Sequence, residues 1–319
     1  MIALQEPCYE IYKAKYQLKE RVGTVVDESI DDTFERVASA LASVEDAEEQ
    51  EYYYDKFLFA LQNGALPAGR IMSNAGAEEL KPNTSLINCT VSGNIPDNIT
   101  GIGQAVKEAM ETLSKGCGIG YCFSSLRPKG ALVGGVGATT SGSLSFMNIF
   151  DSACFTISSA GGRRGAEMAT MHVWHPDIID FINAKRESGR FTQFNLSVLI
   201  TDEFMNAVEK DKEWQLYFPV HPKEFNPNED YIPVKFPFPD DGYIKALYSY
   251  DNDHFEYHSN GEYTICKIYK TLPARELWDL IMESTYKYAE PGIIVIDRYN
   301  KENQLGSVEN IVATNPCGK

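Results

Sequence analysis

The sequence predicts an α/β fold, with a helical N-terminal segment followed by a larger domain built around a parallel sheet. The chain has 319 residues, 43% hydrophobic and 23% charged, so it can bury a substantial core. Residues 1–63 are acidic and show helical periodicity, whereas glycines become frequent in residues 64–319. In this second part short apolar runs alternate with amphipathic helices, a pattern typical of sheets covered on both faces.

The N-terminal segment predicts two helices. Four apolar side chains recur at helical spacing in the first: Phe34, Val37, Leu41 and Val44. Asp31 and Asp32 crowd the beginning of this helix, where the helix dipole favours negative charge. A second helix is expected over 48–62, ending near Gly64, and the acidic run 45–51 reads as a solvated helix face.

The larger domain predicts alternating helices and buried strands. Apolar positions mark two helices: Ile102, Val106, Met110 and Leu113 in one, and Met147, Phe150, Cys154 and Ile157 in the other. Buried strands are expected at 195–201 and 293–296, and Thr201 caps a helix after the first of them. Residues 218–264, rich in Pro, Asp, Asn and Tyr, predict an insertion or hairpin at the rim, outside the central sheet.

Composition excludes several classes of function. The formal net charge is −16, and a chain this acidic is a poor candidate for general nucleic-acid binding. No apolar run is long enough for a membrane span and the N-terminus has no signal pattern, so we expect no membrane association. Seven cysteines, an odd number in a chain too long to need disulfide bracing, indicate the reducing cytoplasm.

Two glycine-rich loops concentrate the scarce positive charge. Their notable members are Arg127 and Lys129 in loop 126–137, and Gly162, Arg163 and Arg164 in loop 161–165. Glycines let a backbone approach a ligand closely, and paired arginines can fork onto phosphate or a base edge. The alternative is a pair of tight turns with solvent-facing charges, and composition alone does not exclude it.

No metal site is predicted. Cys117 and Cys122 are spaced too widely for a CxxC pair. His172 and His175 could form an HxxH ligand pair, but their place at a strand-to-helix corner favours structural histidines.

Two further cysteines are informative only together with the residues around them in the sequence. Cys89 lies in a short apolar run broken by a turn, and alone it reads as a small buried hydrophobe. Asn315-Pro316 predicts a turn that lifts Cys317 onto a loop.

Together these segments resemble the large, catalytic chain of ribonucleotide reductase. The resemblance covers residues 66–317 through ordered motifs: ALPAGRIMSNAG, INCTVSGNIPD, GCGIGYCFSSLRPKGA, SAGGRRGAEMATMHVWHPDIIDFI, FNLSVLITDEFM, AEPGIIVIDRYN and NPCG. The segments GGRRGAEMAT and AEPGIIVIDR are similar to the class II, adenosylcobalamin-dependent branch rather than the di-iron class I branch. The resemblance implies that residues 64–319 form the first part of a ten-stranded α/β barrel with a central finger loop.

The resemblance also implies a reaction that removes the ribose 2′-hydroxyl of a ribonucleotide by radical chemistry. Cys317 matches the finger-loop cysteine that becomes a thiyl radical and takes hydrogen from ribose C3′. Cys89 matches the first of two redox cysteines that form a disulfide. The second cysteine is absent from this chain, and a thioredoxin-like protein reduces the disulfide. Asn315 matches the residue that bonds the ribose hydroxyls, and Asn88 is assigned to substrate binding. Adenosylcobalamin would start the radical while the protein supplies position and a dry cavity.

Loop 126–137 resembles the family's first specificity loop. Arg127 and Lys129 would bind the phosphates of an effector dNTP or ATP, and Asp97 matches the carboxylate on the effector sugar. Effector and substrate would be coupled by ~1–3 kcal/mol.

Loop 161–165 resembles the second specificity loop, in which Arg164 would contact the substrate base and Gly162 is assigned to substrate binding. Effector sites lie at a dimer contact in most members, so we expect a homodimer. Some class II members are monomers with an insertion instead, and residues 218–264 leave that alternative open.

The chain departs from the family at its last residue. The motif continues NPCGE in the family, but Lys319 stands where a glutamate acts as general base, and a charged lysine cannot accept a proton. The rest of the barrel lies downstream in the family. We therefore expect a split enzyme, acting on ribonucleoside di- or triphosphates, that a separate C-terminal fragment completes. The alternatives are a non-catalytic dNTP-binding regulatory subunit and a defective gene product without function.

Overall fold

A computed structural model of the chain divides it into two compact units. The described residues are 5–20, 22–133, 137–161, 165–187, 189–221, 224–238, 245–249, 254–257 and 262–318. One unit comprises Met1–Asn88 with Lys115–Cys117, and the other comprises Cys89–Ser114 with Gly118–Lys319. The predicted organisation into 1–63 and 64–319 stays a prediction.

The first unit is helical, as predicted. Its helices are α1 (Glu6–Lys15), α2 (Ile30–Ala42), α3 (Gln50–Gln62) and α4 (Gly69–Asn74). A capping box begins α2, because Ser29 accepts from the backbone N–H of Asp32 and Asp32 accepts from that of Ser29. Phe34 and Val37 of α2 are buried in the unit's core. Val44 lies beyond the end of α2 and is 82% exposed, so its predicted place on the apolar face is wrong.

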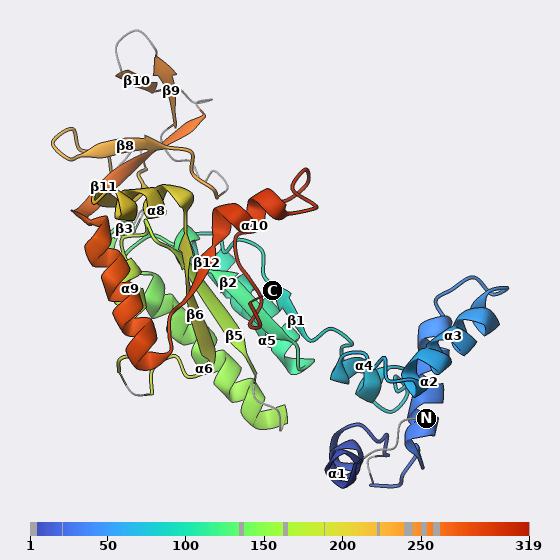
Figure 1. Cartoon of the computed structure of the whole chain (residues 1–319). Coiled ribbons are helices and arrows are strands. Elements are labelled where there is room, and N and C mark those ends of the chain that lie inside the picture. The colour runs from blue at the N-terminus through green and yellow to red at the C-terminus, as the bar shows by residue number, and fades with distance from the viewer. Residues whose placement is uncertain are drawn as a thin grey trace. The chain divides into compact units, whose positions relative to one another are not determined.

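The second unit contains a five-stranded parallel sheet. Its strands are β1 (Cys89–Val91), β2 (Gly118–Cys122), β5 (Glu167–His172), β6 (Phe194–Ile200) and β12 (Gly292–Val295). They lie in the order β1-β2-β5-β6-β12, and every neighbouring pair is parallel. Parallel neighbours need crossover connections, which include α5 (Ile99–Ser114), α6 (Ser143–Gly161) and α9 (Ala274–Tyr288) (Figure 1). The predicted α/β fold class is confirmed.

Short elements complete the connections. They are η1 (Phe123–Ser125), β3 (Leu132–Val133), β4 (Ala138–Thr139), α7 (Ile178–Asn183), α8 (Asp202–Glu209) and α10 (Ile296–Glu302). The Thr201 hydroxyl accepts from the backbone N–H of Phe204 at 3.1 Å, so Thr201 caps α8 as predicted.

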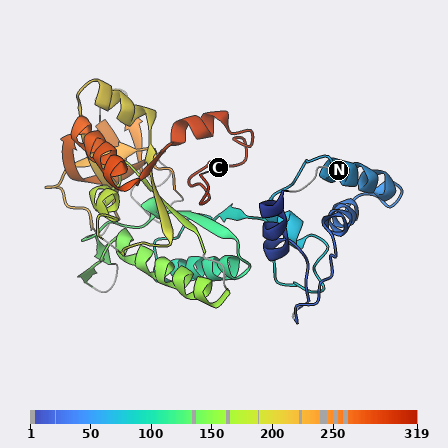
Figure 2. The ribbon, with the colours of Figure 1, turned by 60° about the horizontal axis from the view of Figure 1, so that its bottom comes forward.

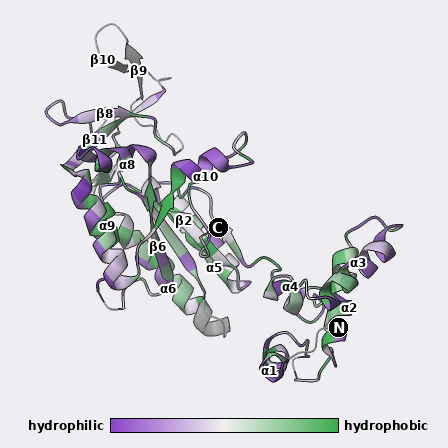
Figure 3. Cartoon of the chain, in the orientation of Figure 1, coloured by the Kyte–Doolittle hydropathy of each residue, from purple (hydrophilic) through white to green (hydrophobic). Residues whose placement is uncertain are grey.

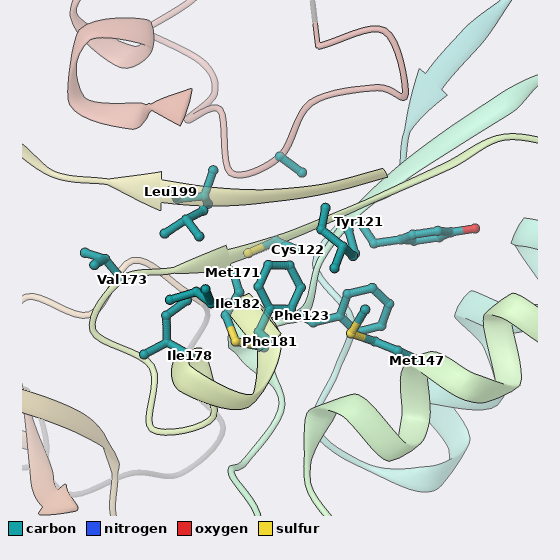
Figure 4. Close-up of a cluster of buried hydrophobic side chains, with 14 of the residues drawn as sticks. Tyr121, Cys122, Phe123, Met147, Met171, Val173, Ile178, Phe181, Ile182 and Leu199 are labelled. Atoms are coloured by element: carbon teal, nitrogen blue, oxygen red, sulfur yellow. The ribbon is translucent and has the colours of Figure 1, made fainter. Parts of the chain in front are cut away.

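The two faces of the sheet have different surroundings. Side chains alternate along β2, so Ile119 and Tyr121 point to one face and the glycines at 118 and 120 point to the other. The Tyr121 ring packs 4.9 Å from that of Phe150 in α6, centroid to centroid. We call this side the helix face, because α5 and α6 lie along it (Figure 2), and Figure 4 shows Tyr121 in its apolar layer. The opposite side is called the loop face.

Two details of the predicted core are wrong. Met110 is 42% exposed, because the buried stripe of α5 shares only Ile102 and Leu113 with the four predicted positions. That stripe consists of Ile102, Ala105, Ala109 and Leu113. Ile293 is 37% exposed, since β12 has a single described neighbour, so the predicted burial of this strand is partial.

A second, antiparallel sheet is separate from the parallel one in its strand pairing. Its strands are β7 (Glu213–Pro219), β8 (Tyr231–Val234), β9 (Lys245–Ser249), β10 (His254–Tyr257) and β11 (Tyr263–Pro273). Among the described residues, no strand of this sheet pairs with the parallel sheet. The interpretation of 218–264 as an insertion stays a prediction.

Hydropathy follows this arrangement. Strands β6 and β12 are mainly hydrophobic, whereas α10 is hydrophilic (Figure 3). Among the residues that the structure describes, none of the helices combines the length and the apolarity that crossing a membrane requires.

The packing of α6 against the sheet predicts a large loss of stability on truncation of Phe150, which is fully buried. Phe150→Ala should lower the free energy of unfolding by about 3–5 kcal/mol, because it leaves a cavity. Phe155→Ala, in the same helix but 59% exposed, should lower it by about 0.5 kcal/mol or less. Tryptophan fluorescence during urea unfolding reports this unit alone. Its three tryptophans are Trp174, Trp214 and Trp278. Equal losses in both variants would contradict the prediction.

Candidate active site

Cys89 and Cys317, 228 residues apart in sequence, lie side by side in the structure. Their Sγ atoms are 3.6 Å apart, farther than the ~2.05 Å of a disulfide bond. Cys89 begins β1 and pairs in register with Gly118 of β2, so its side chain points to the loop face. Cys317 is exposed and Cys89 is half-buried. The structure thus brings together the two cysteines that the sequence singled out.

The backbone that carries Cys317 crosses β2 at its two glycines. A Cβ atom at Gly120 would overlap the carbonyl oxygen of Thr314. A Cβ atom at Gly118 would lie 3.1 Å from Cγ of Pro316 and 3.2 Å from Sγ of Cys89. A glycine in a strand often marks the close approach of another backbone, and here the loop makes that approach.

Two asparagine side chains help to fix this loop, one from β6 and one within the loop itself. Nδ2 of Asn195, on β6, donates to the carbonyl oxygen of Pro316 at 3.1 Å. The side-chain oxygen of Asn315 accepts from the backbone N–H of Cys317 at 3.1 Å, so it helps to form the turn. The role of Asn315 toward ribose stays a prediction. Sequence reasoning did not identify Asn195 or the glycine pair, although the GIG spacing within a strand was a usable signal.

Residues 126–133, the described part of loop 126–137, are fixed to Asp97. Nε of Arg127 lies 2.7 Å from Oδ2 of Asp97, and the backbone N–H of Arg127 donates to Oδ1. Both side chains are largely buried. The backbone N–H of Lys129 donates to the Asp177 carboxylate at 3.0 Å, while Lys129 itself is exposed. Of the three residues predicted to bind an effector, Arg127 and Lys129 therefore lie on one loop, and Asp97 binds that loop.

The two histidines are buried at the corner where β5 passes toward α7. Nε2 of His175 lies 2.9 Å from the carbonyl oxygen of Leu126, and its Nδ1 accepts from the backbone N–H of Asp177. Burial lowers the pKa of His172 to about 3 and also lowers that of His175. Both rings are therefore neutral at physiological pH. Among the described residues, no group of His, Cys, Asp and Glu could hold a metal ion.

Several predicted residues cannot be placed in this site. Gly162, Arg164 and Lys319 lie outside the described residues. Asn88 is exposed and immediately precedes β1. Their predicted roles stay predictions.

Glu167, a buried carboxyl group that sequence reasoning missed, begins β5 just after loop 161–165. The Tyr121 hydroxyl donates to its Oε1 at 2.9 Å, while its Oε2 has no hydrogen-bond partner among the described residues. Burial, aided by the negative charge of Asp151, raises the pKa of Glu167 to about 8. The helix face of the sheet therefore holds a carboxyl group that is mostly protonated at pH 7.

Comparison with known proteins identifies the class of this chain. Residues 87–319 match the family described as "Ribonucleotide reductase, barrel domain", and residues 3–79 match "Ribonucleotide reductase, all-alpha domain". The chain belongs to the ribonucleotide reductase large-chain family.

Individual relatives agree with this assignment. The vitamin B12-dependent ribonucleoside-diphosphate reductase of Mycobacterium tuberculosis is 32% identical over 97% of this chain and 38% of the relative. The protein of the same name from Thermoplasma acidophilum is 32% identical over 68% of the chain and 24% of the relative. The ribonucleoside-diphosphate reductase large subunit of Caenorhabditis elegans is 24% identical over 82% and 32%. The chain thus spans less than two-fifths of the length of these relatives.

The raised pKa of Glu167 predicts a pH-dependent stability. Because the folded state holds this proton from about pH 4.5 to about pH 8, stability falls as the pH rises through that window. Glu167→Gln removes the titration, so its free energy of unfolding relative to the natural chain should rise by up to ~1.4 kcal/mol per pH unit. Urea unfolding at several pH values measures this difference. Glu187→Gln, at an exposed carboxyl group, is the control, and a flat difference for Glu167→Gln would contradict the prediction.

Proposed function

We propose that this chain supplies the thiyl-forming part of a ribonucleotide reductase that acts on ribonucleoside diphosphates. The observation that carries the proposal is the 3.6 Å contact between Cys89 and Cys317 on the loop face. Family membership and the names of the B12-dependent relatives support it. Triphosphate reduction is the alternative that substrate assays distinguish.

Each cysteine has its own task in this proposal. Cys317 loses its thiol hydrogen and abstracts hydrogen from ribose C3′, and an exposed sulfur on a loop can reach both donor and substrate. Cys89 donates a reducing hydrogen from the neighbouring strand and later forms a disulfide with a cysteine supplied by another segment. A thioredoxin-like protein then reduces that disulfide by thiol exchange. Thiols with this task suit a cytoplasmic location.

The proposed cofactor is adenosylcobalamin. It supplies, when bound, the radical that removes the thiol hydrogen of Cys317. The exposure of Cys317 fits this role, because the sulfur is open to a group approaching from the loop face. This chain's own contribution is to hold the sulfur in place beside Cys89.

The effector part of the proposal rests on the first specificity loop. Lys129 is exposed and can bind a phosphate, while Arg127 and Asp97 fix the loop beneath it. A dNTP or ATP is the proposed effector. Self-association into a homodimer belongs to the same proposal.

The remaining barrel segment is proposed to come from a separate C-terminal polypeptide. The sheet supports the need for further strands, whatever their source, because its edge strands β1 and β12 each have a single described neighbour. Such edges pair readily with further strands. This segment would also supply the general-base carboxylate and the partner of Cys89.

Reconstitution tests the proposed function directly. The chain is mixed with a polypeptide that carries the remaining barrel strands, together with adenosylcobalamin, a dithiol and a ribonucleoside diphosphate. We expect deoxyribonucleotide only when both polypeptides are present. Turnover by this chain alone would contradict the split arrangement, and effector binding without any turnover would favour a regulatory subunit.

Cys317→Ser should abolish deoxyribonucleotide formation in this mixture. An O–H bond is stronger than an S–H bond, so serine cannot serve as the hydrogen relay. Cys8→Ser, at an exposed cysteine of α1, should retain full activity. Chromatographic separation of nucleotides measures both variants, and retained turnover by Cys317→Ser would refute the assigned role.

Arg127→Ala should weaken dNTP binding by roughly tenfold to a hundredfold, because it removes a charged hydrogen-bonding group and releases the loop from Asp97. Arg298→Ala breaks an exposed ion pair with Asp202 and should leave binding unchanged. Equilibrium dialysis with each dNTP measures the dissociation constants. Equal affinities for Arg127→Ala and the natural chain would remove the effector site from this loop.

A further inference from the structure

We propose that Asn195, Gly118 and Gly120 are positioning residues that hold the Cys317 sulfur against Cys89. This inference rests on the proposed function, because it names the residues that place the radical-forming thiol. It is carried by contacts among four parts of one unit: β1, β2, β6 and the loop 314–317.

The strand register puts these residues on one face. Gly120 pairs with Met168 of β5, and Met168 pairs with Asn195 of β6, so the three form a row across the sheet. Cys89 and Gly118 form a second row. Registered partners in parallel strands point to the same side, so both rows face the loop.

The glycines set the height of the loop above the sheet. Any side chain at 120 would overlap the Thr314 carbonyl, and the loop would have to lift away. A methyl group at 118 would press on Pro316 and on the Cys89 sulfur, at 3.1 and 3.2 Å. Both positions therefore need glycine for close contact, although their φ angles are not in the left-handed region.

Asn195 holds the loop from β6, two strands away from β2 in the sheet. Its amide N–H bonds the carbonyl of Pro316, the residue immediately before Cys317. Asn195 is exposed on β6, so its side chain is not part of the apolar core and is available to bond the loop. The glycines thus permit the approach, and the amide fixes the loop along the sheet.

The test measures how closely the two thiols are held, without any reductase activity. In a glutathione redox buffer, one thiolate attacks oxidised glutathione and releases one reduced glutathione. The second thiolate then displaces another, so two protein thiols are oxidised as one glutathione disulfide is reduced to two thiols. The equilibrium yield of the Cys89–Cys317 disulfide, measured by peptide mass spectrometry, gives the effective concentration of one thiol at the other.

Asn195→Ala and Asn195→Asp should both lower this effective concentration by about threefold to tenfold, because both remove the donated N–H and the second keeps the shape. Gly120→Ala should lower it further. The controls are Asn206→Ala, at an exposed asparagine of α8, and Gly103→Ala, where a Cβ atom meets nothing within 4 Å. Neither control should change it.

The variants of Asn195 keep the inference testable if Gly120→Ala does not fold. Unchanged disulfide equilibria in both Asn195 variants would overturn the role of Asn195, and an unchanged equilibrium in folded Gly120→Ala would overturn that of the glycines. In the reconstituted mixture, Asn195→Ala should lower kcat with little effect on KM. Altered equilibria alongside an inactive natural enzyme would leave the positioning intact and refute the proposed function instead.

Discussion

The site depends on the close approach of one backbone to another where β2 has no side chains. The Thr314 carbonyl lies in the volume that any Cβ atom at Gly120 would occupy. Because the loop rests directly on the sheet, the sulfur two residues beyond Asn315 reaches the strand that carries Cys89. The other contacts of the loop, from Asn195 and within the Asn315 turn, act on a backbone already placed by this approach.

In this arrangement the two faces of the sheet have different roles. The helix face buries Tyr121 and Phe150 in an aromatic layer that stabilises the strands and holds their register. Even a buried carboxyl group on this face, that of Glu167, is held mostly uncharged, because burial raises its pKa. The loop face can then carry glycines and an exposed thiol, which add little packing energy of their own, since the opposite face supplies the stability.

Local periodicity was sufficient to predict several elements but not the contacts between them. The spacing around Phe34 and Phe150 and the cap at Thr201 specify their helices through near neighbours, and these predictions are confirmed. Met110 was misplaced because apolar spacing cannot tell which of two adjacent stripes a tertiary neighbour will cover, and Val44 because the spacing does not show that the helix ends at Ala42. The pairing of Cys89 with Cys317 spans 228 residues, so no local pattern could supply it, and only resemblance to a family singled out both.

The contacts within one unit suffice to place the two sulfurs, whereas the proposed chemistry needs further strands. Bringing two sulfurs to 3.6 Å needs only β1, β2, β6 and the loop, all within one unit. Radical chemistry needs more, because an exposed sulfur is open to water and oxidants, and a thiyl radical persists only where both are excluded. The contacts that set the position of the thiol lie within one unit, and under the proposed function strands that pair with β1 or β12 would enclose it.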